Sequence, residues 1–490
     1  MTRTATRYET VIGIEVHAQL LTRSKMFCGC PTPTLDSPPN THVDPVCLGM
    51  PGVLPVINRA AVELTIMTGL ALNCEIASEA KFDRKNYHYP DLMKGYQISE
   101  YDMPICKDGW LEIEVEGETR RIGITRVHLE EDTARLQHAT DPATGEQYSL
   151  VDVNRAGLPL MEIVSEPDVR SAEETRAYLQ KLRQLLRYIG ASRANMDEGN
   201  MRCEPNVSLR LPGAEFGQKV ELKNINSFKH AYDAVRFEER RQAEVLDSGG
   251  RVVQETRGWR EDTNQAVPQR TKEFAEDYRY FPEPDLPALS ISREWVEEIR
   301  ARMPELPDDR RQRFETEYSL SPYDARVLAE SRPRADFFEE AVAAAGSPDR
   351  AKAIANWVTG DLARLLNADN ADIEDAKLTP QALAELVALQ EAGTISGKTA
   401  KAVFEEAYRT GKPPKQLVED QGLTQITSSD EVIVSIEKVI AENPKAVEDY
   451  RGGKEEAIKF LVGQVMRETR GRAGPEVVTE LLREKLSAGP

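Results

Sequence analysis

The chain changes character once along its length, and this change limits the folds open to it more than any other feature. From Tyr8 to about Asp285, short apolar or alternating runs are separated by Gly, Pro, Asn and Asp; they include TVIGIEVHAQL, WLEIEVEG, RIGITRVHLEED, PNVSLRL and QKVELKNI. Such runs are typical of strands. The prolines of FPEPDLPALS then mark a boundary, because proline sustains neither a helix nor an interior strand. The sequence therefore predicts an α+β fold, in which a mostly antiparallel sheet domain precedes helices.

Beyond about Ser292 the chain is rich in Ala, Glu, Arg and Leu at helical spacing, as in TPQALAELVALQEAG. A length of 490 residues favours two or three domains. We therefore predict a sheet domain with interleaved helices at 1–291, an all-helical domain at 292–396 and an α-helical tail at 397–490.

Two segments show how strong the helical signals are. In SAEETRAYLQKLRQLLRYIG, Ser171 and Glu174 form a capping box, and Gly190 fits a helix end. In EEAIKFLVGQVMRETRG, one helix face carries Ile458, Leu461, Val462, Val465 and Met466. The opposite face and the following turn are basic, with Lys454, Lys459, Arg467, Arg470 and Arg472.

Composition limits the partners and the compartment. No window approaches the roughly 20 apolar residues of a membrane span, and the first residues lack the apolar core of a signal peptide, so a cytoplasmic protein with no membrane partner is expected. The formal charge of −19 argues against a nonspecific nucleic-acid coat, because phosphate binding needs a basic field. Any RNA must therefore meet a local basic patch.

Acidic residues on strand-like segments are the first candidates for chemistry. In VIGIEVHAQL, period-two alternation places Glu15 and His17 on the same face of a strand. The run HLEED adds Glu130 and Glu131, and Glu162 interrupts the apolar run GLPLMEIV, where an unpaired charge would be unfavourable. The alternatives are an exposed polar strand face for the first pair and a solvated loop for the acidic run.

These ligands suit a hard divalent cation. Oxygen and imidazole ligands with few thiols select Mg²⁺ rather than zinc, and Mg²⁺ commonly holds nucleotide phosphates. Phosphoryl transfer is thus indicated. Neither a P-loop, a dinucleotide-binding GxGxxG motif nor the protein-kinase motifs occur in the sequence, so any ATP site must be of another kind.

Three cysteines near the N-terminus, Cys28, Cys30 and Cys47, suggest a structural metal. Zinc prefers four ligands, and the fourth would be Asp44 or His42. Reduced free cysteines are the alternative. The other cysteines, Cys74, Cys106 and Cys203, are interpreted as buried thiols.

Lysines in the polar, Tyr-rich stretch KFDRKNYHYPDLMKGYQIS form another candidate group. Lys85 and Lys94 could hold phosphates, since an ammonium is a common phosphate-binding charge. A surface loop is the alternative. Glu204 and Lys223 lie on later strand-like segments and carry no signal by themselves.

Several of these segments, taken together and in order, resemble one family, the B subunit (GatB) of the aspartyl/glutamyl-tRNA amidotransferase. The matching segments are VIGIEVHAQL, SKMFCGCP, VCLGMPGVLPVIN, KFDRKNYHYPDLMKGYQIS, HLEEDTA, VDVNRAGLPLMEIVSEPD and VELKNINSF. The tail resembles the tRNA-contacting domain of the same family through ISGKTAKAVFEEAYRTGK, AENPKAVEDYRGGKEEAIKFLVGQVMRETRGRA and VVTELLREKL. A related archaeal subunit, GatE, carries an added insert for which this chain has no room.

The resemblance implies a cradle-like catalytic domain that works with an amidase-type A subunit and a small C subunit. The A subunit would release ammonia from glutamine. The B subunit would phosphorylate, with ATP, the carboxylate of Asp or Glu mischarged on tRNA, and ammonia would then displace phosphate.

The resemblance also implies roles for particular residues. Its Mg²⁺ and ATP positions match here at Glu15, His17, Glu130, Glu131 and Glu162, with Mg²⁺ on Glu15, His17, Glu130 and Glu162. Its ammonia-channel positions match at Lys85, Lys94 and Glu204. At the position of Glu204, Asp is also familiar in the family. Many relatives carry a zinc set CxC…CxxC, but this chain has Asp44 in place of the third Cys, so a zinc site would comprise Cys28, Cys30, Asp44 and Cys47.

Two other classes of function compete with this interpretation. One is a noncatalytic tRNA-binding scaffold, which clustered acids argue against because they repel RNA. The other is a stand-alone metal-dependent hydrolase, which would act without ATP or partner subunits.

Overall fold

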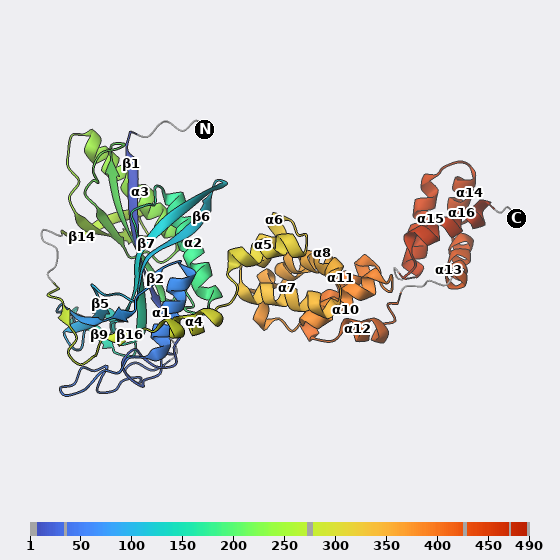
Figure 1. Ribbon diagram of the computed structural model, residues 1–490. Coiled ribbons are helices and arrows are strands. Elements are labelled where there is room, and N and C mark those ends of the chain that lie inside the picture. Colours follow the sequence, from blue (N-terminus) through green and yellow to red (C-terminus); the bar gives the residue numbers. More distant parts are fainter. Residues whose placement is uncertain (1–6, 34–36, 272–277, 425–428, 470–471, 488–490) are drawn as a thin grey trace. The chain divides into compact units, whose positions relative to one another are not determined.

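The structure is a computed structural model that describes residues 7–33, 37–271, 278–424, 429–469 and 472–487. The chain divides into two compact units, Met1–Leu306 and Pro307–Pro490, and each is described by itself (Figure 1).

A twelve-stranded sheet, counted over the described residues, forms the centre of the N-terminal unit. Its main path runs β14 (Gln265–Thr271), β13 (Glu255–Arg260), β12 (Val220–Lys223), β11 (Met201–Arg210), β1 (Glu9–Gln19), β10 (Pro159–Ser165), β7 (Glu118–Glu131), β5 (Tyr96–Glu100), β4 (Phe82–Asn86) and β15 (Phe281–Pro282). β6 (Cys106–Val115) pairs with β7, and β2 (Glu75–Ile76) pairs with β6. β12 and β13 are parallel, and the other named pairs are antiparallel.

Helices cover one face of this sheet. α1 (Arg59–Ala71), α2 (Ala172–Tyr188) and α3 (Phe228–Asp247) contact β7, β6 and β11, respectively, and α4 (Arg293–Ala301) contacts α1 (Figure 1). The apolar side of β1, which includes Ile12, Ile14 and Val16, is fully buried in the resulting core. Because side chains alternate along a strand, Glu15 and His17 lie on the opposite face.

Local signals set the ends of these helices. Ser171 caps α2 by accepting from the Glu174 backbone N–H, and the Glu174 carboxylate accepts in turn from the backbone N–H of Arg170. Gly190, with φ of +72°, ends the helix in the left-handed conformation that glycine adopts without strain. The predicted helix at this position is therefore confirmed.

Two smaller sheets complete the N-terminal unit. β8 (Arg135–Thr140) and β9 (Gln147–Asp152) form a two-stranded hairpin, and β3 (Glu79–Ala80) pairs with β16 (Leu289–Ser290).

The C-terminal unit is helical throughout its described residues and contains two separate apolar cores. The first core, from Phe314 to Val418, is built by α5 (Pro307–Glu317), α6 (Pro322–Leu328), α7 (Arg332–Ala345), α8 (Ala351–Asn356), a π-helical turn η2 (Trp357–Leu362), α9 (Ala363–Asp369), α10 (Pro380–Glu391), α11 (Gly397–Thr410) and α12 (Pro414–Asp420), with short 3₁₀ turns η1 (Pro348–Arg350) and η3 (Ile373–Asp375). The second core belongs to α13 (Ser429–Glu442), α14 (Pro444–Arg451), α15 (Glu456–Glu468) and α16 (Pro475–Ser487).

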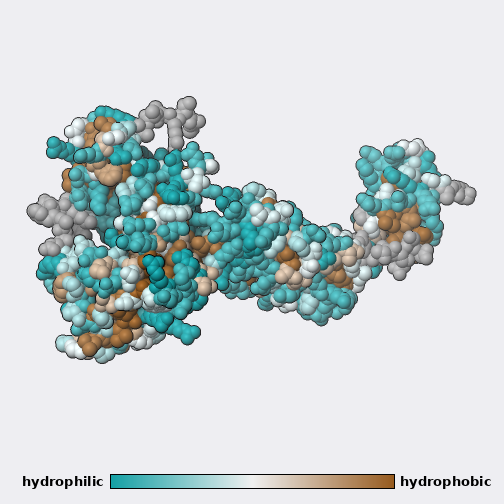
Figure 2. Space-filling view, in the orientation of Figure 1, coloured by the Kyte–Doolittle hydropathy of each residue, from teal (hydrophilic) through white to brown (hydrophobic). Residues whose placement is uncertain are grey.

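The predicted apolar face of α15 is packed: Ile458, Leu461 and Val465 are buried in the second core, and Val462 and Met466 pack against it. The predicted α+β class, a mostly antiparallel sheet with helices followed by helices alone, is thus confirmed. The three-part division at residues 291 and 396 stays a prediction. Among the described residues no helix combines the length and apolarity that crossing a bilayer needs, and Figure 2 shows mainly hydrophilic residues on the visible face.

Candidate functional site

The pairing of β1 with β10 and β11 brings several predicted acids together on the face of the sheet that carries Glu15 and His17. β1 lies between β10 and β11, so His17 stands opposite Glu162 on one side and Arg202 on the other. Paired residues of adjacent strands point to the same side of a sheet. The polar face of β1 therefore faces charged side chains on both sides.

One group of ligand atoms, which we call the histidine cluster, comprises His17, Glu130 and Glu162. The His17 Nε2 lies 3.5 Å from Glu130 Oε1 and 3.5 Å from Glu162 Oε2. One ligand atom from each of the three residues lies within 4.8 Å of the others. Glu130 and Glu162 are only 2% and 7% exposed, so this group is shielded from bulk water.

Charge governs the protonation of this cluster. Burial lowers the pKa of His17, but the carboxylates of Glu162 and Glu130 outweigh it and raise the pKa to about 9. Burial opposes ionisation of Glu162, yet His128 and His17 together hold the pKa of its carboxyl well below the usual range. The His128 Nε2 lies 3.2 Å from Glu162 Oε2. The nearest cationic groups to these buried carboxylates are imidazoles, and the Arg126 guanidinium lies 4.0 Å from Glu162 Oε1.

A second group, the lysine cluster, comprises Glu15, Glu204 and Glu221 together with Lys223. The three carboxylates lie within 4.8 Å of one another. The Lys223 ammonium lies 2.9 Å from Glu204 and 3.5 Å from Glu221. Burial and the neighbouring acids, Glu162 first among them, raise the pKa of Glu15.

The predicted four-ligand set is thus divided in the structure. His17, Glu130 and Glu162 come together, whereas the Glu15 carboxylate groups with Glu204 and accepts a hydrogen bond of 3.1 Å from Asn206 Nδ2. Glu15 and His17 are adjacent on one strand face, about 7 Å apart at the ordinary strand rise.

The next two acids, Glu131 and Asp132, have partners of their own. Glu131 pairs with Lys94 and accepts from the backbone N–H of Ile98 at 2.9 Å. Asp132 accepts from Gln19 Nε2 at 2.7 Å and from Arg202 Nη2 at 3.0 Å. Although burial opposes ionisation of Asp132, Arg202 and Arg155 hold the pKa of its carboxyl below the usual value.

Lys85 lies in strand β4, next to tyrosines that the sequence reasoning missed. Its ammonium is 5.0 Å from the Tyr278 ring centroid. Burial lowers the pKa of Lys85, but Glu130 leads the neighbours that raise it overall, and Tyr280 and Glu162 add to this effect. Tyr278 and Tyr280 belong to the segment YRYF just before the proline-rich boundary, and only its density of tyrosines could have drawn attention to it.

The cysteines near the N-terminus form a third cluster. One ligand atom from each of Cys28, Cys30, Asp44 and Cys47 lies within 4.8 Å of the others, and His42 is not a member. A hydrogen bond from Cys28 lowers the pKa of the Cys47 thiol to about 6 and raises that of Cys28. Cys74, Cys106 and Cys203 are buried free thiols, as predicted.

Comparison with known proteins shows the family of the chain. Residues 10–297 match the family model described as the GatB/GatE catalytic domain, and residues 336–486 match the one described as the GatB domain. These matches include every member of the histidine, lysine and cysteine clusters.

Similar proteins extend over the whole chain. The chain is 54% identical over 492 residues to the B subunit of the aspartyl/glutamyl-tRNA(Asn/Gln) amidotransferase of Dehalococcoides mccartyi strain 195, covering 99% of this chain and 100% of that protein. It is 55% identical over 481 residues to the protein of the same name from Carboxydothermus hydrogenoformans, covering 98% and 99%. The chain therefore belongs to the family of aspartyl/glutamyl-tRNA(Asn/Gln) amidotransferase B subunits.

Proposed function

We propose that this chain is the ATP-using subunit of a glutamine-dependent amidotransferase, which converts Asp-tRNA(Asn), Glu-tRNA(Gln) or both into Asn-tRNA(Asn) and Gln-tRNA(Gln). Family membership supports the reaction class. The histidine cluster is the observation on which the assignment of the reaction centre depends. In it, two buried carboxylates and an imidazole lie close together on the face of the sheet that carries His17.

The donor set of this cluster fits a divalent cation. Mg²⁺ prefers oxygen ligands at about 2.1 Å, which puts ligands on opposite sides roughly 4 Å apart, close to the spacing in the cluster. His17, Glu130 and Glu162 would hold it. A bound Mg²⁺ would supply charge neutralisation for the transferring phosphoryl group.

The side chains around the cluster would orient the two chemical steps. An oxygen of the amino acid carboxylate attacks the γ-phosphorus of ATP and ADP leaves, so a poor leaving oxygen becomes phosphate. The Lys85 ammonium, close to Glu130, would hold a phosphate oxygen during this step. Ammonia then attacks the acyl carbon and phosphate leaves. Glu204 would accept the proton that nitrogen loses.

Ammonia would reach this centre from a partner. We infer that an amidase-type A subunit and a small C subunit complete the enzyme, and that Lys85 and Glu204 line the final part of the ammonia path. Lys94, predicted to share this path, instead pairs with Glu131, whose side chain points to the opposite face of the sheet from Glu130. Glu131 pairs with Lys94 and accepts from Ile98, so we assign it the role of positioning Lys94 rather than binding a second cation.

The tail would contact tRNA. Lys459 and Arg467 are exposed on α15, and Lys454 is exposed just before it; Arg470 lies outside the described residues. Deleting the chain from α13 on, which removes the second core and leaves the first intact, should weaken tRNA affinity while the glutaminase activity of the complex persists. Unchanged affinity would place the RNA elsewhere.

The cysteine cluster would hold a structural zinc. Three thiols and one carboxylate at mutual distances under 4.8 Å suit a tetrahedral site, and the low pKa of Cys47 favours the thiolate that zinc needs. Metal analysis of the purified protein tests this. We expect about one zinc per chain, bound more tightly in an Asp44→Cys variant, and a zinc-free protein would refute the assignment.

The experiment that tests the proposed function uses the complete complex with ATP and both mischarged tRNAs. His17→Ala should bind tRNA but form no phosphorylated aminoacyl intermediate, and Glu298→Gln, an exposed change on α4, should behave as wild type. Full activity of His17→Ala would refute the assignment. Turnover without ATP or partners would indicate a hydrolase, and tRNA binding without any amidation would indicate a scaffold.

A further inference from the structure

A buried lysine lies beside the cysteine cluster, and nothing in the function proposed above uses it. Lys25 is 1% exposed, whereas lysine ammonium groups ordinarily stay in water. Its side chain passes Gly157 on the same side as Cys47, because a Cβ added at Gly157 would lie 3.6 Å from Lys25 Cδ and 3.7 Å from Cys47 Cβ. The lysine is therefore part of the packing around the proposed zinc ligands.

Two backbone carbonyls hold the Lys25 ammonium. It donates to the His42 oxygen at 2.8 Å and to the Val153 oxygen at 3.3 Å. His42 lies in the loop that carries Asp44 and Cys47, which we call the ligand loop, and Val153 follows β9, so the ammonium joins two segments that are far apart in the sequence. An ammonium has three donors, and the part of the chain that the structure describes offers this one neither a third hydrogen bond nor an ion pair with a carboxylate.

The charge of Lys25 needs a partner in this position. A buried charge without a counter-charge is strongly unfavourable. The ammonium acts electrostatically on the thiol groups of Cys30 and Cys47, which carry a negative charge only as thiolates. Zinc binds thiolates, and three of them together with the Asp44 carboxylate bring more negative charge than one Zn²⁺ neutralises. An occupied zinc site would thus supply the charge that Lys25 lacks, and Lys25 would offset the excess.

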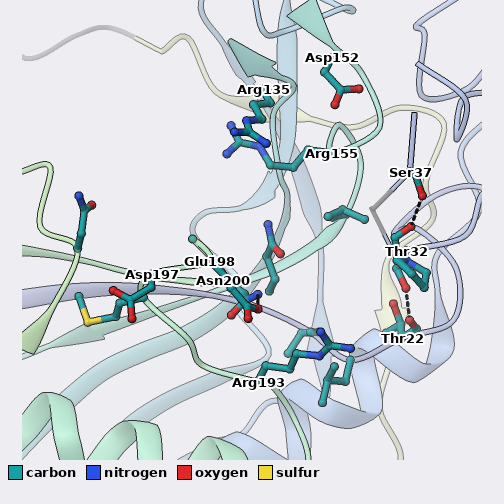
Figure 3. A pocket seen from close by; sticks show the side chains of 18 of the residues that line it. Thr22, Thr32, Ser37, Arg135, Asp152, Arg155, Arg193, Asp197, Glu198 and Asn200 are labelled. Atoms are coloured by element: carbon teal, nitrogen blue, oxygen red, sulfur yellow. Dashed lines mark hydrogen bonds between the residues drawn. The ribbon is translucent and has the colours of Figure 1, made fainter. Parts of the chain in front are cut away.

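Backbone contacts fix the position of Lys25 relative to two of the ligands. Its backbone N–H donates to the Cys30 carbonyl at 3.0 Å, which closes the turn that carries Cys28. Just outside this turn, the Thr32 hydroxyl donates to the Thr22 carbonyl (Figure 3). The lysine and both cysteines therefore belong to one closed loop.

We propose that Lys25 is the buried counter-ion of the zinc site and holds its ligand loop in place. This inference rests on the zinc site of the proposed function. Lys25 is not a ligand, because an ammonium has no lone pair. It acts on the metal through the thiolates and through the ligand loop. Zinc affinity therefore depends on the charge at position 25 as well as on the four ligands, since groups outside a ligand set commonly tune metal binding.

A purely structural lysine would behave differently. If Lys25 only filled space, its replacement would destabilise the zinc-free and the zinc-bound protein equally. Zinc affinity, which measures the difference between these two forms, would then stay unchanged. The affinity for zinc is therefore the quantity that separates a counter-ion from a packing residue.

The first test measures the zinc affinity of the full chain by competition with a chelator. Lys25→Met keeps an unbranched side chain of similar length but removes the charge, and we expect a Kd for zinc roughly 10–100-fold larger than that of wild type. Lys107→Met, the same change at an exposed position on β6, is the matched control and should bind zinc as wild type does. A Kd for Lys25→Met within about twofold of wild type would overturn the proposal.

Lys25→Gln provides a second variant in case the first fails to fold. Glutamine keeps a donor for one of the two carbonyls and removes the charge, so its zinc affinity should fall in the same way. A chelator should also lower the Tm of wild type more than that of Lys25→Gln, because a ligand that binds more weakly stabilises less. Equal effects of the chelator on the two proteins would contradict a counter-ion role.

Co²⁺ in place of zinc separates charge from geometry, because its absorption bands report the ligands and their arrangement. Lys25→Met should show the wild-type Co²⁺ spectrum but reach it only at a higher Co²⁺ concentration. A changed spectrum would show that Lys25 determines which groups bind the metal, and would overturn the proposal.

The wild-type result separates this inference from the proposed function. A wild-type chain that binds no zinc would refute the zinc assignment and this inference together. A wild-type chain that binds zinc, with Lys25 variants that bind it equally well, would refute this inference alone. Amidation of tRNA is not a readout in either case, so the amidotransferase assignment is tested separately.

Discussion

The two carboxylate clusters along β1 differ in the cation that balances them. In the histidine cluster, imidazoles from His17 and His128 face Glu162. In the lysine cluster, the ammonium of Lys223 lies between Glu204 and Glu221. An imidazole can release its proton and offer a lone pair to a metal, whereas a lysine ammonium has only donors. The two clusters contain similar acids and lie one strand step apart, but the residues of the histidine cluster can bind a metal, whereas the lysine cluster keeps its own cation.

The largest expected effect follows from neutralising the histidine cluster. Glu162→Gln removes one of its two buried negative charges, so ATP-dependent amidation should fall on the order of 10²–10³-fold, as for loss of one preorganised electrostatic group. Steady-state rates of the complete complex measure this. Glutamine hydrolysis should persist in the same preparation. A loss below about threefold would show that the two clusters are equivalent or that neither holds the reacting groups.

An intermediate effect is expected in the lysine cluster. Lys223→Met leaves three carboxylates together without their counter-ion. Because the Lys223 side chain is 31% exposed, solvent screens part of the repulsion, and we expect a loss of about 1–2 kcal/mol in unfolding free energy. Thermal unfolding of the chain measures it. The double variant Lys223→Met/Glu204→Gln should recover most of the loss.

The Lys223→Met variant should also respond differently to Mg²⁺. Without Lys223, the lysine cluster becomes an acidic group with no resident cation, so added Mg²⁺ should restore thermal stability to Lys223→Met more than to wild type. If Mg²⁺ protects both proteins equally, the ammonium does not decide which cluster takes a metal.

The smallest effect concerns Glu100, a buried carboxyl in the core with neither an imidazole nor an ammonium. It accepts from the backbone N–H groups of Leu129 and Ile105, and its Oε1 has no partner among the described residues. Burial raises its pKa to about 8. The folded state thus keeps a proton that the unfolded chain releases above about pH 4.5, so this contribution to stability is complete below that pH and is lost as pH rises through about 8.

Glu100→Gln mimics the protonated form at every pH. At pH 9 the variant should unfold roughly 2–4 °C above wild type, corresponding to about 1 kcal/mol, and at pH 5 the two should coincide. Calorimetry at both pH values measures this. A variant that is no more stable than wild type at pH 9 would show that burial does not raise the pKa of Glu100.

The sequence predicted the strand that carries the site but not the register that completes it. Period-two alternation correctly placed Glu15 and His17 on one face, and the isolated charge of Glu162 correctly singled out that strand. Which residues stand opposite Glu15 depends on the β1–β11 register, which no local pattern encodes; this register brings Glu204 to Glu15 and separates it from the other predicted ligands.

The alternation of side chains along β7 also explains why the neighbouring acids of HLEED have different partners. Successive residues of β7 point to opposite faces, so Glu130 joins His17 while Glu131 reaches Lys94. The tyrosines near Lys85 come from a segment almost 200 positions later. Only the tertiary fold brings such residues together.

Whether the histidine cluster binds the metal can be measured directly by titrating the protein with Mn²⁺ in place of Mg²⁺. The titration is observed by paramagnetic resonance with ATP present. We predict one site in wild type, that site and an additional weaker one in Lys223→Met, and loss of the site in Glu162→Gln. Equal binding by wild type and Glu162→Gln would contradict the claim that His17, Glu130 and Glu162 form the metal–nucleotide centre.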